Sequence, residues 1–319
     1  MPAGGTSRSP RSPPRRPSAR PATTTSSMSR PSGVSSDAVL DLHRRPGPPA
    51  DDGATIRIDG DGAPGGDAPA GWRWVSFSAH TLTDGSSITR AGDGREVGVV
   101  VLEGEARVSV GGRHLGQVGS RASVFDEVPA PVVLVEPGQG VEITALGAAS
   151  IALAAAPGGD VRETRLIDPE TTRIEARGSG RMARTVRHLL PAEEPAGRLL
   201  IVEVITPGGN WSSYPPHKHD TDDPPRECLL EELYYYRFAL PQGFAFQRVY
   251  TSDRTLDEAL TPMDGDVVLV PRGYHPVAAA AGYDCYYLNV MAGPVREWRF
   301  TLDPDHAWLM DWSPDVPRG

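Results

Sequence analysis

Two histidines separated by a single residue are the first sign of chemistry in this chain of 319 residues. His217 and His219 lie in the stretch YPPHKHD, on either side of Lys218, the only lysine in the sequence. Because residues i and i+2 of a β-strand point to the same face, both imidazoles could enter one cavity. Imidazole nitrogen binds zinc, iron and other transition metals, but two ligands make a weak site. The pair therefore raises the hypothesis of a metal site whose remaining ligands lie elsewhere.

Two later stretches supply candidates for those ligands. In EELYYYR, strand alternation places the carboxylate of Glu232 on one face together with the phenols of Tyr234 and Tyr236. In GDVVLVPRGYHPV, two glycines bracket an apolar strand, and His275 follows a Pro-x-Gly turn. The candidate metal ligands are therefore His217, His219, His275 and a carboxylate of the EELYYYR strand, Glu231 or Glu232.

Four other histidines have no such companions in the sequence. We expect structural roles for His80, His114, His188 and His306. Cys228 and Cys285 are too few for a disulfide framework or a four-thiolate zinc site. We expect both to be small buried side chains of a protein in the reducing cytoplasm.

Strand signals dominate the chain from about residue 70 onward. Short runs of β-branched and aromatic residues alternate with turns rich in Gly and Pro, and no helical period is apparent. One series of runs covers 70–158, and a second with the same pattern covers 181–300. We therefore predict an all-β protein of two packed antiparallel barrels or jelly rolls, with a linker at 159–180 and a C-terminal cap at 301–319.

The two series differ in the chemistry that their side chains offer. All nine tyrosines lie between Tyr214 and Tyr287, in the second series. The first series has only His80 and His114, and neither belongs to a His-x-His pair. We therefore expect the first barrel to be structural, without metal, and the second to hold the metal site.

Composition separates the N-terminal segment from the rest of the chain. Residues 1–50 contain ten prolines and carry a net charge of +6, whereas the remainder carries −15. Such a Pro-, Arg- and Ser-rich segment cannot bury enough apolar surface to fold, so we expect 1–50 to be disordered. The acidic body argues against nucleic-acid binding. No stretch approaches the roughly 20 consecutive apolar residues of a membrane span, so we expect no membrane partner.

The predicted ligands resemble the two motifs of the cupin family. His-x-His, a later Glu and Gly-x5-Pro-x-Gly-x-His form the pattern by which cupins hold one divalent metal through three histidines and one glutamate. The gap between His219 and Glu232 is longer than in that pattern, which keeps Glu227 and Glu231 open as alternatives. We favour Glu232 because it lies on the tyrosine-rich strand.

Longer motifs are similar to those of a narrower family, the 5-deoxy-glucuronate isomerases of myo-inositol catabolism. These motifs are SSYPPHKHD, LEELYYYRF, QGFAFQRVYTSD, GDVVLVPRGYHPV, GYDCYYLNVMAGP and PDHAWL, within a resemblance that spans roughly residues 70–310. The family is related to the 4-deoxy-L-threo-5-hexosulose-uronate ketol-isomerases. The resemblance implies a bicupin of two packed jelly-roll barrels, a homo-oligomer, and one divalent metal, with zinc favoured over manganese or iron.

The resemblance also implies an aldose–ketose isomerisation, from 5-deoxy-D-glucuronate to 5-dehydro-2-deoxy-D-gluconate. Such a reaction needs a metal to polarise the carbonyl, a proton carrier between C1 and C2, and a cation for the substrate carboxylate. For the proton carrier we consider Lys218, which strand alternation points away from the histidines, and Tyr250; a hydride shift would need no residue. The predicted substrate-binding residues are Arg248 and Arg272 for the carboxylate and Gln247, Tyr234, Tyr236 and Tyr287 for the hydroxyl groups.

Two other functions are compatible with the same fold, since a fold does not fix a function. One is a metal-dependent cupin dioxygenase, which would need Fe(II) and an apolar substrate pocket. The other is a non-enzymatic cupin that binds a sugar acid. The density of Tyr, Gln and Arg around the motifs favours a polyhydroxy acid as the small-molecule partner.

Overall fold

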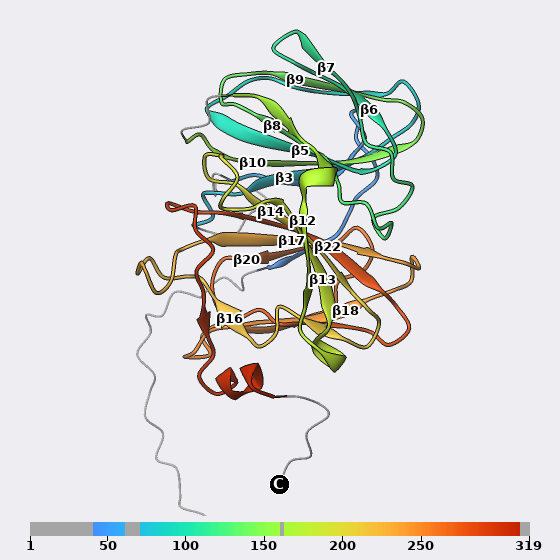
Figure 1. The fold of residues 1–319 in the computed structure, drawn as a ribbon. Coiled ribbons are helices and arrows are strands. Elements are labelled where there is room, and N and C mark those ends of the chain that lie inside the picture. Colours follow the sequence, from blue (N-terminus) through green and yellow to red (C-terminus); the bar gives the residue numbers. More distant parts are fainter. Residues whose placement is uncertain (1–40, 61–70, 160–162, 313–319) are drawn as a thin grey trace, which may run out of the picture. The chain divides into compact units, whose positions relative to one another are not determined.

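The computed structural model describes residues 41–60, 71–159 and 163–312, and these form an almost entirely β structure (Figure 1). The helices in this part of the chain are three short 3-10 turns, at Pro169–Thr171, Gly180–Met182 and Ala307–Met310. None of these helices has the length and apolar character needed to cross a membrane. The strands build two packed β-barrels, which confirms the predicted fold class.

The first barrel consists of two antiparallel sheets. Its strands are β2 (Ala54–Ile58), β3 (Ser76–Leu82), β4 (Ser87–Arg90), β5 (Arg95–Glu103), β6 (Ala106–Val110), β7 (Arg113–Val118), β8 (Val132–Val135), β9 (Val141–Ala145), β10 (Ala149–Pro157) and β11 (Arg165–Ile167). The larger sheet has the order β11-β8-β5-β10-β3-β2, and the smaller has the order β4-β9-β6-β7. Aliphatic side chains such as Val99, Val108 and Ile143 fill the space between the two sheets.

The second barrel repeats this arrangement with a larger inner sheet. Its strands are β1 (His43–Arg44), β12 (Arg173–Arg177), β13 (Arg184–Leu190), β14 (Leu200–Thr206), β15 (Trp211–Ser212), β16 (His217–Lys218), β17 (Glu231–Phe238), β18 (Ala245–Tyr250), β19 (Asp257–Leu260), β20 (Val267–Val270), β21 (Val277–Ala279), β22 (Cys285–Ala292) and β23 (Thr301–Leu302). The seven-stranded sheet has the order β1-β20-β17-β22-β14-β13-β12. Opposite it lie a four-stranded sheet, β15-β21-β18-β19, and the pair β16-β23.

A further core lies where the large sheets of the two barrels pack face to face (Figure 1). Because side chains alternate along a strand, the five strands between the edges of the seven-stranded sheet, β20, β17, β22, β14 and β13, contribute to two cores. On β17, Leu233 packs toward the first barrel, whereas Tyr234 faces the interior of the second. On β14, likewise, Ile201 packs toward the first barrel and Val202 faces the interior of the second.

Buried charges also join the two barrels. Glu203 on β14 is fully buried and pairs with Arg121 of the first barrel at 3.0 Å and with Arg187 on β13 at 3.1 Å. The hydroxyl of Tyr286 donates a hydrogen bond to the same carboxylate at 3.0 Å. One carboxylate therefore serves two guanidinium groups and a phenol at the barrel interface.

Two further carboxylates bind backbone amides across this interface. Glu96 of the first barrel accepts hydrogen bonds from the N–H groups of Gly197 and Leu199, both at 2.7 Å. Glu231 of the second barrel accepts one from the N–H of Trp74 at 2.6 Å. Glu231, an alternative in the sequence for the metal-binding carboxylate, therefore faces the first barrel, one residue out of phase with Glu232.

Two predicted boundaries differ from the structure. Residues 1–40 of the predicted disordered segment lie outside the described part of the chain, but Leu42 is buried and β1 pairs with β20. The predicted linker at 159–180 contributes β11 to the first barrel and β12 to the second. Both segments contain many polar residues because they form sheet edges. In β12, for example, all five residues are exposed or half-buried, and few of them are apolar.

Replacing Glu203 with Gln should strongly destabilise the protein. The substitution keeps the side-chain volume but leaves two buried guanidinium groups without a negative charge, which costs about 3 kcal/mol of unfolding free energy or more. Urea denaturation measures this difference. Glu297→Gln is the control, because Glu297 forms an exposed pair with Arg299 and its loss should cost less than about 1 kcal/mol. Equal stability of the two variants would contradict the role of Glu203.

Candidate metal centre and adjoining cavity

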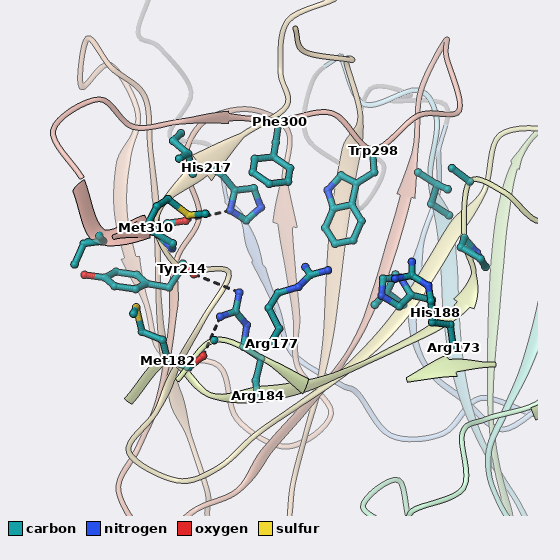
Figure 2. Close-up of a pocket in the computed structure, with 18 of the residues that line it drawn as sticks. Arg173, Arg177, Met182, Arg184, His188, Tyr214, His217, Trp298, Phe300 and Met310 are labelled. Atoms are coloured by element: carbon teal, nitrogen blue, oxygen red, sulfur yellow. Dashed lines mark hydrogen bonds between the residues drawn. The ribbon is translucent and has the colours of Figure 1, made fainter. Parts of the chain in front are cut away.

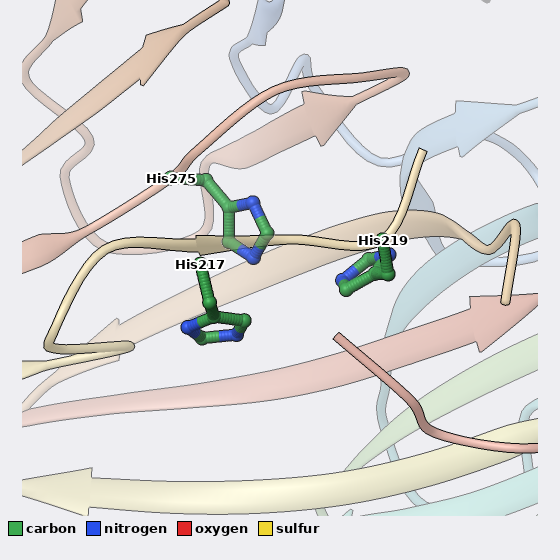
Figure 3. A group of neighbouring side chains, drawn as sticks. All are labelled: His217, His219 and His275. Atoms are coloured by element: carbon green, nitrogen blue, oxygen red, sulfur yellow. The ribbon is translucent and has the colours of Figure 1, made fainter. Parts of the chain in front are cut away.

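Three histidines converge inside the second barrel (Figure 3). His217 is on β16, His219 follows that strand, and His275 lies in the loop between β20 and β21. All three are buried, and one ring nitrogen of each lies within 4.8 Å of the others. The structure thus brings together three of the four residues predicted as metal ligands.

Backbone carbonyls orient the three imidazole rings. The Nδ1 atoms of His217, His219 and His275 lie 3.3, 2.9 and 2.8 Å from the carbonyl oxygens of Pro215, Leu230 and Gly273. Since a carbonyl oxygen can only accept, each Nδ1 must carry the proton, and each Nε2 is left with its lone pair. This is the arrangement in which protein histidines hold metals.

Glu232, the predicted fourth ligand, completes the group. Its Oε2 lies 2.7 Å from Nε2 of His219 and 2.9 Å from Nε2 of His275. Its Oε1 accepts a hydrogen bond from the side-chain amide of Asn289. Burial alone would raise the pKa of Glu232, but positive charge shared with His275 and His219 outweighs this and holds the pKa well below its usual value. The carboxylate is therefore ionised.

The contacts among these four side chains call for a positive charge between them. With protons on Nδ1, the Nε2 atoms and the ionised Glu232 all present lone pairs to one another, and Nε2 of His275 has no hydrogen-bond partner. Burial, with the neighbouring His275 and His219, lowers the pKa of His217 to about 3, so this imidazole stays neutral. A proton could bridge one contact, whereas a divalent cation would satisfy all four ligands at once. The donor set therefore fits a metal.

Four residues predicted to bind the substrate face the barrel interior. Tyr234 and Tyr287 meet at Ser213, whose Oγ lies 2.9 and 3.4 Å from their hydroxyl groups. Deeper in the barrel, the hydroxyl of Tyr236 donates a hydrogen bond to Oε1 of Gln247 at 2.8 Å. Tyr234 and Tyr287 line a cavity, and Tyr236 and Gln247 pair with each other behind it.

The structure places Lys218 away from the histidines. Its Nζ lies 2.8 Å from Oε1 of Glu227 and forms an ion pair with Asp220. Burial alone would lower the pKa of Lys218, but these two carboxylates raise it above its usual value. Strand alternation turns this ammonium away from the histidines, and its ion pair also keeps Glu227 from the metal cluster. A role of Lys218 in proton transfer stays a prediction.

Tyr250, the other predicted proton carrier, anchors the C-terminal segment instead. Its hydroxyl donates a hydrogen bond to Oδ2 of Asp303 at 2.7 Å. The guanidinium groups of Arg248 and Arg254 each lie 4.3 Å from the centre of its ring. Tyr250 lines neither cavity beside the histidines, because it belongs to the outer face of β18.

The two arginines predicted for the substrate carboxylate also lie outside the barrel. Arg248 alternates with the inward-facing Gln247, so it points to solvent and pairs with Asp257 at 2.7 Å. Arg272 is exposed in the loop that precedes His275. Both predictions were wrong about direction, because closeness in sequence to a metal motif does not decide which face a side chain takes.

The cavity beside the histidines is lined by other arginines (Figure 2). It has a volume of about 600 Å³, and His217, Trp298 and Phe300 form part of its wall together with Arg173, Arg177 and Arg184. A smaller cavity of about 30 Å³ shares Arg177, Arg184 and His217 and extends to Glu232. The sequence analysis missed these arginines because they fall in or next to the predicted linker. The pattern that could have revealed them is the strand alternation in RIEAR and RTVRH, which places Arg173 and Arg177 on one face of their strand and Arg184 and His188 on one face of the next.

Glu175 organises part of this wall. It forms a bidentate pair with Arg177 at 2.8 and 2.7 Å, and its Oε2 lies 3.1 Å from Nε2 of His188. Hydrogen bonds from Arg177 are the main reason that the pKa of Glu175 falls to about 2. His188, which we expected to be structural, lines the cavity as well. It is four residues along β13 from Arg184, on the order of 13 Å away.

The chain is similar to proteins of one family along most of its length. Residues 63–309 match the KduI/IolB family. The 5-deoxy-glucuronate isomerase of Geobacillus kaustophilus is 47% identical over 241 residues, which cover 76% of this chain and 87% of that protein. The 5-deoxy-glucuronate isomerase of Bacillus subtilis is 45% identical over 239 residues, which cover 75% and 88%.

Solved structures agree with this relationship. An IolB-like protein from Salmonella typhimurium superposes with a TM-score of 0.79 at 43% identity, over 85% of this chain and 99% of that one. An oxalate decarboxylase from Lactobacillus farciminis superposes with a TM-score of 0.51 at 14% identity, over 75% and 82%, and this likeness concerns the fold alone. The sequence matches and the two-barrel fold agree: this chain belongs to the KduI/IolB family.

Proposed function

We propose that this protein is a 5-deoxy-glucuronate isomerase, which converts the C1 aldehyde and C2 hydroxyl of 5-deoxy-D-glucuronate into a primary alcohol and a ketone. The observation that carries the proposal is the buried cluster of three histidines and Glu232 at the wall of a cavity that also contains arginines. The relatives named as this isomerase, at 45% and 47% identity, support the same reaction here.

His217, His219, His275 and Glu232 are the residues that would hold the metal. When bound, a divalent metal would polarise the substrate carbonyl and stabilise the negative charge that develops on its oxygen. Three imidazoles and one carboxylate suit zinc, so we propose zinc ahead of manganese or iron. Asn289 fixes the orientation of Glu232, and the three backbone carbonyls fix the rings, so the ligand geometry exists before substrate arrives.

Tyr234 and Tyr287 would act as hydrogen-bond donors to the sugar hydroxyl groups. Burial raises the pKa of Tyr287 to about 12 and that of Tyr234 well above its usual value, so both phenols keep their protons near neutral pH. Ser213 links the two phenols. Trp298 and Phe300 add apolar surface to the cavity wall next to His217.

Removal of one histidine should remove the metal and the activity together. We expect His275→Ala to lower bound metal from about one ion per chain to a small fraction, because a buried four-ligand site loses one ligand. Turnover of 5-deoxy-glucuronate should fall at least about 100-fold. Metal is measured by mass spectrometry, and activity is measured before and after chelation with each metal restored. His114→Ala is the matched control, since His114 is exposed on the first barrel.

Full activity of a metal-free preparation would refute the metal-assisted mechanism even if the substrate is correct. Oxygen uptake during turnover would point instead to a dioxygenase, because an isomerase consumes no oxygen.

Substitution of Lys218 distinguishes a structural lysine from a catalytic one. We expect Lys218→Gln to lower thermal stability, because Asp220 and Glu227 lose their shared cation, while kcat falls less than about tenfold and its pH dependence is unchanged. Thermal melting and a pH–rate profile measure both effects. A loss of about 1000-fold or more in kcat with metal still bound would show that Lys218 carries a proton after all.

A further inference from the structure

Two arginines face each other across neighbouring strands of the cavity wall. Arg177 on β12 and Arg184 on β13 are direct partners in the antiparallel register. Like charges directly opposite each other destabilise a sheet unless counter-charges neutralise them. Both side chains point into the cavity beside His217 in Figure 2.

Only one of the two has a carboxylate partner. Arg177 is neutralised by the bidentate pair with Glu175. The guanidinium of Arg184 donates to two neutral acceptors, the carbonyl oxygens of Met182 at 2.9 Å and Tyr214 at 3.3 Å. Among the residues that the structure describes, no carboxylate forms an ion pair with Arg184. Burial is the main reason that the pKa of this guanidinium is lowered, and the positive charge of Arg177 lowers it further.

Neither of the carboxylates that line the two cavities forms an ion pair with Arg184. Glu193 is exposed at the wall of the larger cavity. Glu232 belongs to the cluster with His219 and His275 and accepts a hydrogen bond from Asn289. Of the five N–H groups of a guanidinium, Arg184 uses two on carbonyls, so the others remain available for an anion.

Arg184 also lies beside the metal cluster rather than at the far end of the cavity. It lines the small cavity together with His217, Glu232 and Tyr287, whereas His188 and Arg173 line only the larger one. An anion on Arg184 would therefore lie near the metal cluster, and the larger cavity of about 600 Å³, which Arg184 also lines, offers room for the carbon chain of the substrate.

We infer that Arg184 is the residue that binds the substrate carboxylate and makes the site specific for a uronate over a neutral sugar. This inference rests on the proposed function. A planar guanidinium with free N–H groups matches a carboxylate, and the bound anion would supply the counter-charge that the Arg177–Arg184 pair lacks. Arg177 is a weaker candidate, because two of its N–H groups already bind the carboxylate of Glu175.

The test compares two substrates that differ only in the charged group. The metal-loaded protein is assayed with 5-deoxy-glucuronate and with 5-deoxy-glucose, which has a primary alcohol in place of the carboxylate. We expect the wild-type protein to favour the uronate, and Arg184→Gln to raise KM for the uronate by roughly 10- to 100-fold while leaving the values for 5-deoxy-glucose nearly unchanged. Arg184→Lys should restore part of the preference, because it keeps the charge without the planar fork.

A binding measurement tests the same residue without turnover. Calorimetric titration with the acid in which the C1 aldehyde is reduced to an alcohol should give a Kd that rises by a similar factor in Arg184→Gln. Arg248→Gln is the matched control, because Arg248 is an exposed arginine paired with Asp257. It should leave KM and Kd unchanged.

The possible failures are distinguishable. If the metal-loaded wild-type protein does not isomerise the uronate, the proposed function fails. If it does, but Arg184→Gln weakens both substrates equally or neither, the assignment of Arg184 is overturned. If Arg184→Gln does not fold, the inference is tested by the substrate preference of the wild-type protein and of Arg184→Lys. Equal KM values of the wild-type protein for the two substrates would then overturn it.

Discussion

Strand alternation in the seven-stranded sheet of the second barrel is the constraint on which both the fold and the site depend. One face of this sheet packs against the first barrel, and the other lines the interior that contains the histidines. Neither face is open to solvent over most of its area, so a one-residue shift of any strand would exchange the two sets of side chains. Glu231 and Glu232 illustrate the result, since neighbouring carboxylates bind backbone amides of the first barrel and histidines of the second.

The same architecture serves two purposes in the two barrels because their interiors differ in polarity. Mostly aliphatic side chains fill the first barrel, so that its interior contributes mainly packing energy. The buried polar pair Ser78–His80 on β3 is satisfied by its own hydrogen bond of 2.9 Å. In the second barrel, tyrosines and histidines line the interior, where the phenols of Tyr234 and Tyr236 pair with Ser213 and Gln247 and the Nδ1 atoms of the histidines with backbone carbonyls. The first barrel thus supports the sheet from behind and keeps the ligand-bearing strand β17 in place.

The sequence was sufficient to predict the parts of this protein that short-range patterns determine. His217, His219 and His275 were predictable because spacing and flanking glycines mark them, and Tyr234 and Tyr287 because long β-runs reveal their phase. Arg248 was placed on the wrong face because its strand contains apolar residues on both faces, so that its phase was not evident. Arg184 was missed for another reason: it becomes part of the site only through the pairing of β12 with β13, which is a long-range property of the sheet.

Charge balance on the two faces of β13 links the fold to the site. Arg187 faces the first barrel and shares the buried Glu203 with Arg121, so the protein itself supplies the counter-charge at that interface. Arg184, on the opposite face of the same strand, meets Arg177 and two neutral carbonyls. A permanent carboxylate beside Arg184 would stabilise the sheet but would also repel an anionic substrate and compete for the guanidinium. Two arginines directly opposite each other cost the sheet local stability, and the anion that we infer to bind Arg184 would recover it.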